Sequence, residues 1–167
     1  MVDVGEKPET RRVALAEAIV TLSEEAFARV RRSEIAKGDV LTVAKLAGIQ
    51  AAKETSWLIP LCHPILLDVI RVDLFLVAAD RAVRIEAQVA TRGKTGVEME
   101  AMTAAAVAAL TIYDMCKGVD RGAAIGGVRL LKKSGGRSGD WVRPTPARAG
   151  AKRSSRDPVR SAPGRKA

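Results

Sequence analysis

The longest regular pattern in the sequence covers residues 94–117, where apolar side chains follow one another without leaving a polar face. No charged residue occurs between Glu100 and Asp114. A helix that is apolar on every side must be covered on several sides, so this pattern predicts a helix in the centre of the fold. Thr95 followed by Glu98 predicts a capping box at its start, and a glycine follows its last turn. Charge returns only at the two helix ends, which are therefore the places to look for chemistry.

Shorter patterns predict the rest of the secondary structure. Strands are expected, from alternation or β-type runs, over residues 11–22, 65–78, 82–92 and 125–133. Two further helices are expected over residues 23–32 and 40–54, the second with Asp39 as its N-cap.

This order of elements is strand, two helices, two strands, helix and strand, which is typical of a split βαβ arrangement. We therefore expect an α+β fold: a ferredoxin-like antiparallel sheet with helices packed on one face and an extra helix in the first crossover. Such a sheet leaves its other face to solvent or to a partner. Together with the apolar central helix, this favours an oligomer.

The positive charge of the chain is concentrated at its end. The formal net charge is +9 over 167 residues, but residues 141–167 hold eight basic residues and one acidic residue. That segment also holds four of the seven prolines and few large apolar residues, so it is expected to be a disordered basic tail. Residues 1–140 are nearly neutral and are expected to form a single catalytic domain.

Cysteine usage and hydropathy bear on the cellular location. Cys62 and Cys116 are too few for a disulfide framework, and no charged-then-apolar leader opens the chain, so a reducing cytoplasm is expected. The longest uninterrupted apolar run, residues 104–110, is far shorter than the ~18 residues that a membrane-spanning helix needs. No membrane partner is expected.

Several polar residues allow both a structural and a chemical interpretation. Lys37 lies in a glycine turn and is either a solvated lysine or a candidate acid or base. His63, the one histidine, could fill a structural role near the core, and the two prolines that restrict its backbone favour a functional role only modestly. Asp114 and Lys117 have the spacing of a helix-surface salt bridge, yet a desolvated lysine can have its pKa lowered into a catalytic range.

Residues 132–139 form a glycine-rich basic loop that can hold phosphate oxygens with backbone N–H groups and cationic side chains. The loop lacks the spacing of a P-loop, and no G-x-G-x-x-G motif follows a strand. With two cysteines and one histidine in the chain, a resident metal site is not expected either.

Five motifs, taken in order, resemble one known family. They are KGD at residues 37–39, AGIQAAK at 47–53, LIPLCHP at 58–64, KTGVEMEA at 94–101 and LTIYDMCK at 110–117. Together they are similar to the molybdenum cofactor biosynthesis protein C family, the cyclic pyranopterin monophosphate synthases. The resemblance covers residues 1–141 and leaves the tail outside.

The resemblance implies a lyase. Its substrate would be 3′,8-cyclo-7,8-dihydroguanosine triphosphate, which is rearranged to cyclic pyranopterin monophosphate with release of pyrophosphate. The subunit would be ferredoxin-like and assemble into a hexamer, a trimer of dimers, with active sites at subunit interfaces. No cofactor is firmly implied, and Mg²⁺ bound to the triphosphate or pyrophosphate is the one ion left open.

The resemblance also implies a set of functional residues. Catalytic roles fall on Lys37, His63, Glu98, Glu100, Asp114 and Lys117. Substrate contacts fall on Leu61, Cys62, His63, Met99, Glu100, Lys133 and Arg137. Where relatives often carry a second lysine in the loop, Arg137 keeps the charge, and we expect it to contact phosphate only. We expect Lys37 and Lys117 to act as general acid or base, with Asp114 orienting Lys117.

Four more of these side chains have expected roles. His63 and Lys133 would lie near the phosphates, while Glu98 and Glu100 would hold the base or assist proton transfer.

Two other classes of protein share some of these sequence features. Ferredoxin-like sheets can bind nucleic acid, and the pI is about 10.1, but RNA-binding sheets of this type stack bases on exposed aromatic side chains. The chain has five aromatic residues, and its candidate strands carry only Phe75, so no specific nucleic acid is expected. A purely structural oligomer would leave the charged helix ends and the lysine-containing turns unexplained.

Overall fold

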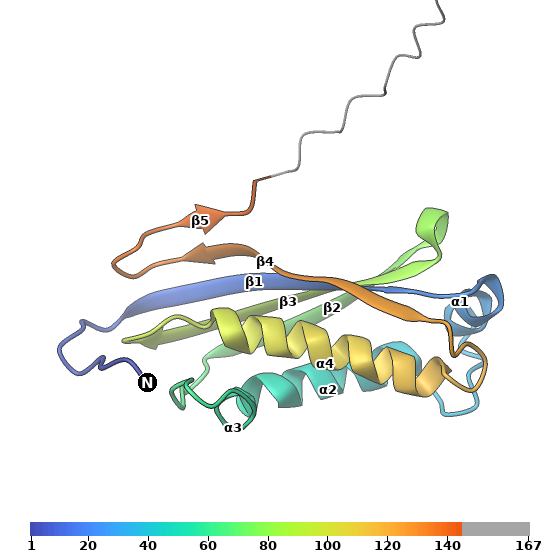
Figure 1. Ribbon diagram of the computed structural model, residues 1–167, viewed down its shortest axis with the longest axis horizontal. Helices are drawn as coiled ribbons and strands as arrows, with labels where there is room; N and C mark the ends of the chain where they lie inside the picture. The colour runs from blue at the N-terminus through green and yellow to red at the C-terminus, as the bar shows by residue number, and fades with distance from the viewer. Residues whose placement is uncertain (145–167) are drawn as a thin grey trace, which may run out of the picture.

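The fold is built on one antiparallel sheet (Figure 1). The computed structural model describes residues 1–144. Its strands are β1 (Thr10–Thr21), β2 (Val69–Val77), β3 (Ala82–Gly93), β4 (Ala124–Ser134) and β5 (Trp141–Val142). Its helices are α1 (Glu24–Arg31), α2 (Val40–Lys53), α3 (Thr55–Leu58), the short 3-10 helix η1 (Ala78–Asp80) and α4 (Glu98–Cys116). The strand order is β2-β3-β1-β4-β5 with every pair antiparallel, which confirms the predicted α+β class.

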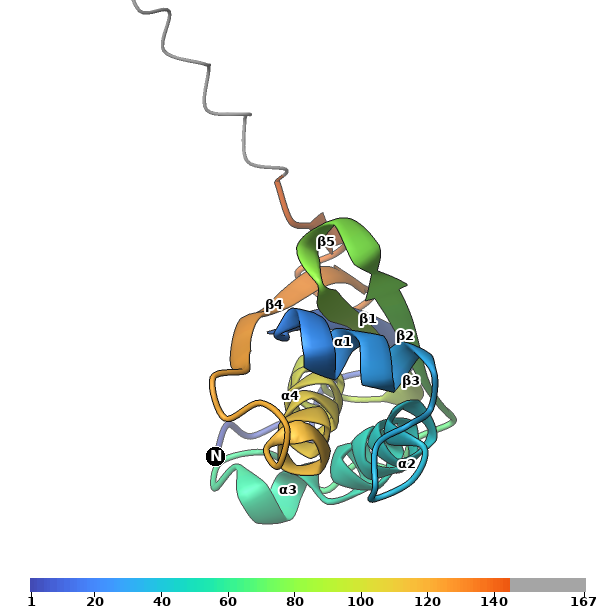
Figure 2. The same cartoon turned by 90° about the vertical axis from the view of Figure 1, so that its right-hand side faces the viewer.

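One face of the sheet is covered by α2 and α4, which run side by side (Figures 1 and 2). The side chains of β1 on this face are small and fully buried: Ala14, Ala16, Ala18 and Val20. Small residues on the strand let an alanine-rich helix approach closely, so α4 becomes the centre of the core. Because α1 and α2 both lie between β1 and β2, the predicted extra helix in the first crossover is confirmed.

The start of α4 differs from the prediction. Val97, rather than Thr95, is the N-cap residue, and no side chain caps the helix there. Val97 is only 1% exposed, so its burial in the core fixes where the helix begins. The side chain of Glu98 folds back over Gly96, where a Cβ atom would lie 1.9 Å from its carboxylate oxygen. The predicted capping box is therefore wrong, and Glu98 has no capping role.

Three other segments also depart from the prediction. The strand expected from residue 65 begins at Val69, and residues 55–58 form α3, which no pattern indicated. Trp141 and Val142, placed in the tail by the sequence, form β5 and pair with Lys133 and Lys132. The expected domain boundary after residue 140 therefore falls inside a strand pair. The rest of the expected disordered tail, residues 145–167, lies outside the described residues.

The opposite face of the sheet carries ion pairs. Glu17 is only 5% exposed, and both Nε and Nη2 of Arg129 on the neighbouring strand donate to its carboxylate, at 2.6 and 2.5 Å. Arg84 pairs with Glu86 and stacks over the ring of Phe75 at 4.7 Å. An arginine thus already stacks on the one aromatic ring of the predicted strands, although the ring is 40% exposed, and this contact does not favour base stacking there.

The outer side of α4 is left partly uncovered within one chain. Met99 and Leu110 are 37% and 57% exposed, and Met102 and Ala106 between them are half-buried. By length and composition alone α4 is long and apolar enough to cross a membrane, but its inner alanines pack against α2 and the sheet, as in the core helix of a soluble fold. The apolar helix predicted from the sequence is therefore covered on most of its sides, with one stripe remaining.

Candidate active site

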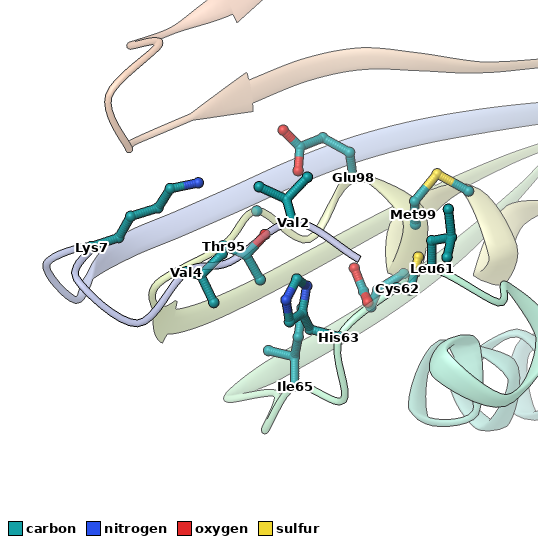
Figure 3. Close-up of a pocket in the computed structure, with 12 residues that line it drawn as sticks. Val2, Val4, Lys7, Leu61, Cys62, His63, Ile65, Thr95, Glu98 and Met99 are labelled. Carbon is teal, nitrogen blue, oxygen red and sulfur yellow. The ribbon is translucent and has the colours of Figure 1, made fainter.

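A pocket of about 340 Å³ opens beside the first turn of α4 (Figure 3). Six of the residues that the resemblance selected line it together: Leu61, Cys62, His63, Glu98, Met99 and Glu100. They come from two segments, the loop after α3 and the start of the central helix. We call this hollow the acid pocket, because two carboxylates line it.

The loop that carries His63 is fixed to the sheet by hydrogen bonds. Thr91 on β3 donates its hydroxyl to the carbonyl of Leu66 at 2.5 Å, and the N–H of Asp68 donates to Ala90 at 3.0 Å. On the other side, the N–H of Cys62 donates to the carbonyl of Ile59 at 3.0 Å and closes a turn. These contacts hold a half-buried imidazole on a short irregular segment.

Burial changes the proton affinities of two groups in the acid pocket. Glu100 is only 4% exposed, and the pKa of its carboxyl is raised, mainly by desolvation and further by the charge of Glu98. The pKa of the Cys62 thiol is raised by burial and by the charge of Glu100. Glu100 is therefore suited to accept and release a proton during a reaction.

A second hollow of about 510 Å³ adjoins the acid pocket and shares Lys7, Thr95, Gly96 and Glu98 with it. Its other lining residues are Arg12, Lys94, Arg137 and Ser138. Lys133 donates to the hydroxyl of Ser138 and therefore lies next to a lining residue of this hollow. Four cations lining one hollow favour a bound polyanion, and we call it the cation pocket.

Arg12 is a site residue that the sequence analysis did not select. Its guanidinium donates to the carbonyls of Gly93 at 3.4 Å and Lys94 at 3.3 Å. Gly136, at φ +79°, lies against it so closely that a Cβ atom would be 1.6 Å from Nη1. The sequence did contain a signal for this role. Arg12 and the buried Ala14 are two positions apart on β1 and so lie on the same face of the sheet, where a charged side chain needs a partner.

The other end of α4 carries a separate cluster. Nζ of Lys37 donates to Oδ2 of Asp114 at 2.7 Å and to its backbone carbonyl at 2.9 Å. Nζ of Lys117 lies 2.7 Å from Oδ1 of the same carboxylate. Lys117 first and Lys37 second lower the pKa of Asp114 to about 2, while Asp114 raises the pKa of Lys117. Of the two interpretations left open for Lys117, the single chain shows the helix-surface salt bridge and not a desolvated lysine, because Lys117 is 53% exposed and ion-paired.

Comparison with known proteins identifies the family. A sequence model of the MoaC family matches residues 1–136. The chain belongs to the MoaC family. The resemblance drawn from the five motifs is thereby confirmed.

Relatives in this family are similar over most of the chain. The cyclic pyranopterin monophosphate synthase of Thermomicrobium roseum is 57% identical over 143 residues, which cover 86% of this chain and 86% of that protein. The synthase of a Roseiflexus species is also 57% identical, over 85% of this chain and 90% of its own. Human molybdenum cofactor biosynthesis protein 1 is 55% identical over 86% of this chain, a match that spans 22% of the human protein.

In this MoaC-family chain the predicted catalytic residues form two clusters rather than one. Glu98 and Asp114 are sixteen positions apart on α4, which corresponds to about 24 Å along a straight helix. His63, Glu98 and Glu100 lie in the acid pocket, whereas Lys37, Asp114 and Lys117 meet at the far end. One chain therefore does not bring all six into a single pocket.

The described part of this MoaC-family chain, residues 1–144, holds no group of three or more His, Cys, Asp or Glu side chains with metal-site geometry. The polar groups of the two adjoining pockets are instead cations on one side and carboxylates with an imidazole on the other. This arrangement is suited to holding an anion while protons move on an attached organic ring.

Proposed function

We propose that the protein is a cyclic pyranopterin monophosphate synthase, a lyase of molybdenum cofactor biosynthesis. It converts 3′,8-cyclo-7,8-dihydroguanosine triphosphate to cyclic pyranopterin monophosphate and releases pyrophosphate. The observation that carries this proposal is the direct junction of the acid pocket with the cation pocket, which share Lys7, Thr95, Gly96 and Glu98. The substrate has the same division, with a reactive heterocycle at one end and a triphosphate at the other.

The cation pocket holds the phosphates in this proposal. Arg12, Lys94, Lys133 and Arg137 stabilise the charge that develops on departing pyrophosphate. Arg137 offers a planar donor set to phosphate oxygens, in keeping with a contact role and no proton transfer. Any Mg²⁺ in the reaction enters with the phosphates and is part of the substrate.

The acid pocket holds the base and ribose. Glu100 is buried with a raised pKa, and it exchanges protons with the rearranging ring. Glu98 and His63 line the same pocket, with Glu98 assisting proton transfer and His63 placed toward the phosphate side. Leu61, Cys62 and Met99 supply its apolar wall.

The lysine cluster supplies general acid or base chemistry. Asp114 orients Lys117 and Lys37 through two charge-assisted hydrogen bonds of 2.7 Å. In the free chain these bonds favour the ammonium form of Lys117, so its first role is that of a proton donor. Because the cluster lies about 24 Å from Glu98 along α4, it serves the acid pocket of a neighbouring subunit.

The assembly proposed is a hexamer, a trimer of dimers, with the active sites at subunit interfaces. The partly exposed apolar stripe along α4 supports burial against another copy, because a single chain leaves it open to water. The catalytic domain is residues 1–140 extended by β5. The two cysteines are unpaired, as expected for a reducing cytoplasm, where we place the protein.

The deciding experiment supplies the full-length protein with the cyclised nucleotide and follows pyrophosphate release and pterin formation together. Equal amounts of both products are expected, and they should require catalytic amounts of protein. Parallel reactions with chelator and with added Mg²⁺ establish whether the ion takes part. If the folded oligomer forms neither pyrophosphate nor the pterin, the proposal is wrong.

A further inference from the structure

The first residues of the chain lie along both pockets. Val2, Val4 and Lys7 line the acid pocket, where Figure 3 shows Val4 and Val2 beside Thr95 and His63. Lys7 also lines the cation pocket. Residues 2–7, which we call the strap, therefore line the acid pocket and reach the cation pocket through Lys7.

The strap is compact but weakly attached. The N–H of Gly5 donates to the side chain of Asp3 at 2.8 Å, and the N–H of Lys7 donates to the carbonyl of Val4 at 3.1 Å. Among the hydrogen bonds of residues 1–144, one joins the strap to the rest of the protein, from Nζ of Lys94 to the carbonyl of Gly5 at 2.7 Å. Val4 is half-buried, while Val2 is 71% exposed. Few contacts of this kind allow a segment to open at small energetic cost.

The single attachment is made by a cation that belongs to the cation pocket. A lysine ammonium has three N–H donors, and Gly5 uses one of them. The other two are available to an anion in the pocket that Lys94 lines. Such an anion would hold Lys94, which lies outside the strap, and would attract Lys7, which the strap carries.

We propose that residues 2–7 are a strap that closes when phosphate oxygens occupy the cation pocket, and that Lys7 is a phosphate-positioning residue carried by it. The proposal rests on the proposed function for the nature of the anion, the triphosphate end of the substrate or released pyrophosphate. By linkage, strap closure and anion binding strengthen each other by the same factor. Closure also separates the acid pocket from bulk water.

Inorganic pyrophosphate is the probe, and a protease that cleaves after glutamate reports the state of the strap. The bond after Glu6 lies in the strap, and the bond after Glu34, which is an exposed residue in the segment between α1 and α2, is the internal reference. Saturating pyrophosphate should slow cleavage after Glu6 by about fivefold or more, the lower range of common allosteric couplings, and leave cleavage after Glu34 unchanged. Unchanged cleavage after Glu6 at saturation, or no binding of pyrophosphate, would overturn the proposal.

Three variants separate strap closure from simple charge attraction. Lys7→Met and Lys94→Met should each lose the protection and bind pyrophosphate several-fold more weakly. Val4→Ser removes packing but no charge, and it should also weaken binding, because closure becomes less favourable. Lys45→Met on α2, a lysine paired with Asp73 outside both pockets, is the matched control and should behave as wild type. If Lys7→Met binds as tightly as wild type, Lys7 has no positioning role.

The two proposals fail in different ways. If the protein binds pyrophosphate and protects the strap but does not convert the cyclised nucleotide, the proposed function is wrong and the strap proposal still holds. Normal turnover without protection would contradict the strap alone.

Discussion

Lys37 donates to the carboxylate of Asp114 at 2.7 Å, although 77 positions separate the two residues in the sequence. The contact joins the turn before α2 to the last turn of α4, and a second lysine, Lys117, binds the other carboxylate oxygen. Asp114 thus fixes two ammonium groups side by side on a surface open to solvent. An exposed ion pair contributes little to stability, so positioning the lysines explains the arrangement better.

The pH dependence of stability tests this contact. The pKa of Asp114 is lowered from 3.8 to about 2, so the ionised carboxylate stabilises the folded protein. This stabilisation is complete above pH 3.8 and is lost as the pH falls toward 2. For Lys117 the pKa is raised from 10.5, so its contribution is present below that value and is lost as the pH rises above it. The difference in unfolding temperature between wild type and Asp114→Asn should therefore stay constant between about pH 5 and pH 9 and shrink toward pH 2. An equal difference at pH 2 and pH 5 would show that the ion pairs do not form in solution.

Replacement of either lysine in this cluster should stop the reaction without unfolding the protein. Lys117→Ala and Lys37→Ala should each lower kcat by about 10²–10⁴, the usual effect of removing a general acid or base. Lys117→Arg should not restore activity, because guanidinium does not release its proton at working pH. Lys45→Ala is the control, since Lys45 is as exposed as Lys37 and also pairs with an aspartate, Asp73. Near-normal kcat in Lys117→Ala or Lys37→Ala would remove that lysine from the mechanism.

The fold could be predicted because its signals are local. Strand alternation, helix periodicity and the Asp39 cap depend on neighbouring residues, and the Asp39 side chain does accept from the N–H groups of Leu41 and Thr42. The start of α4 could not be placed in this way, because the burial of Val97 depends on the strands beneath it. Likewise, β5 forms because the loop after β4 returns Trp141 to an open sheet edge, which composition alone does not reveal.

The site residues likewise divide into those with local sequence signals and those that depend on distant contacts. The resemblance assigned functional roles to six residues that meet in the acid pocket, but it assigned none to Arg12, or to Lys94 at the start of the fourth motif. These two residues lie near the glycine-rich loop of residues 132–139 only because β1 pairs with both β3 and β4. The hydrogen bond from Arg12 to Gly93, for example, joins residues more than 80 positions apart. Sequence spacing is enough to predict which side chains lie together at a helix end. To predict which residues are neighbours across a sheet, the order of the strands must be known.

Glu100→Gln should be inactive but more stable at neutral pH. The pKa of Glu100 is raised above 4.5 by burial, so the folded protein binds a proton that the unfolded chain has already lost. Stability therefore falls as the pH rises through this range, and the ionised carboxylate is a cost at neutral pH. Urea unfolding at pH 4 and pH 7.5 should show a larger gain for the variant at pH 7.5. The opposite sign would mean that the carboxylate is stabilised by a partner in the assembly.

Removal of Arg129 should destabilise the protein through the buried Glu17. Arg129→Met leaves a carboxylate that is 5% exposed without its charge-assisted hydrogen bonds. Because Arg129 itself is 43% exposed, water can enter, and we expect a loss of about 2 kcal/mol, below the value for a fully buried pair. Glu17→Gln combined with Arg129→Met should recover part of the loss in chemical denaturation, since no charge is then buried. Equal losses in the single and double variants would show that the charge of Glu17 is not the cause.

The last prediction concerns how two chains share one active site. Glu98 and Asp114 lie at opposite ends of α4, about 24 Å apart along the axis, which is long for one small substrate. If the lysine cluster of one subunit completes the acid pocket of its mate, Glu98→Gln and Asp114→Asn should each be inactive alone and complement when mixed. In a hybrid dimer one site receives both substitutions and the other receives neither. Equal, random mixing makes half of the dimers hybrid, so about a quarter of wild-type activity should return.

The matched control mixes Asp114→Asn with Lys117→Ala. Both substitutions lie in the same cluster, joined by a contact of 2.7 Å, so every site in a hybrid would contain one of them and no activity should return. Subunit exchange has to be shown separately, by mass spectrometry of differently labelled chains. Exchange without recovery of the Glu98→Gln and Asp114→Asn pair would place both carboxylates in a site formed by one chain. Because Val97 and not Thr95 caps α4, loss of a capping box could not account for the inactivity of Glu98→Gln.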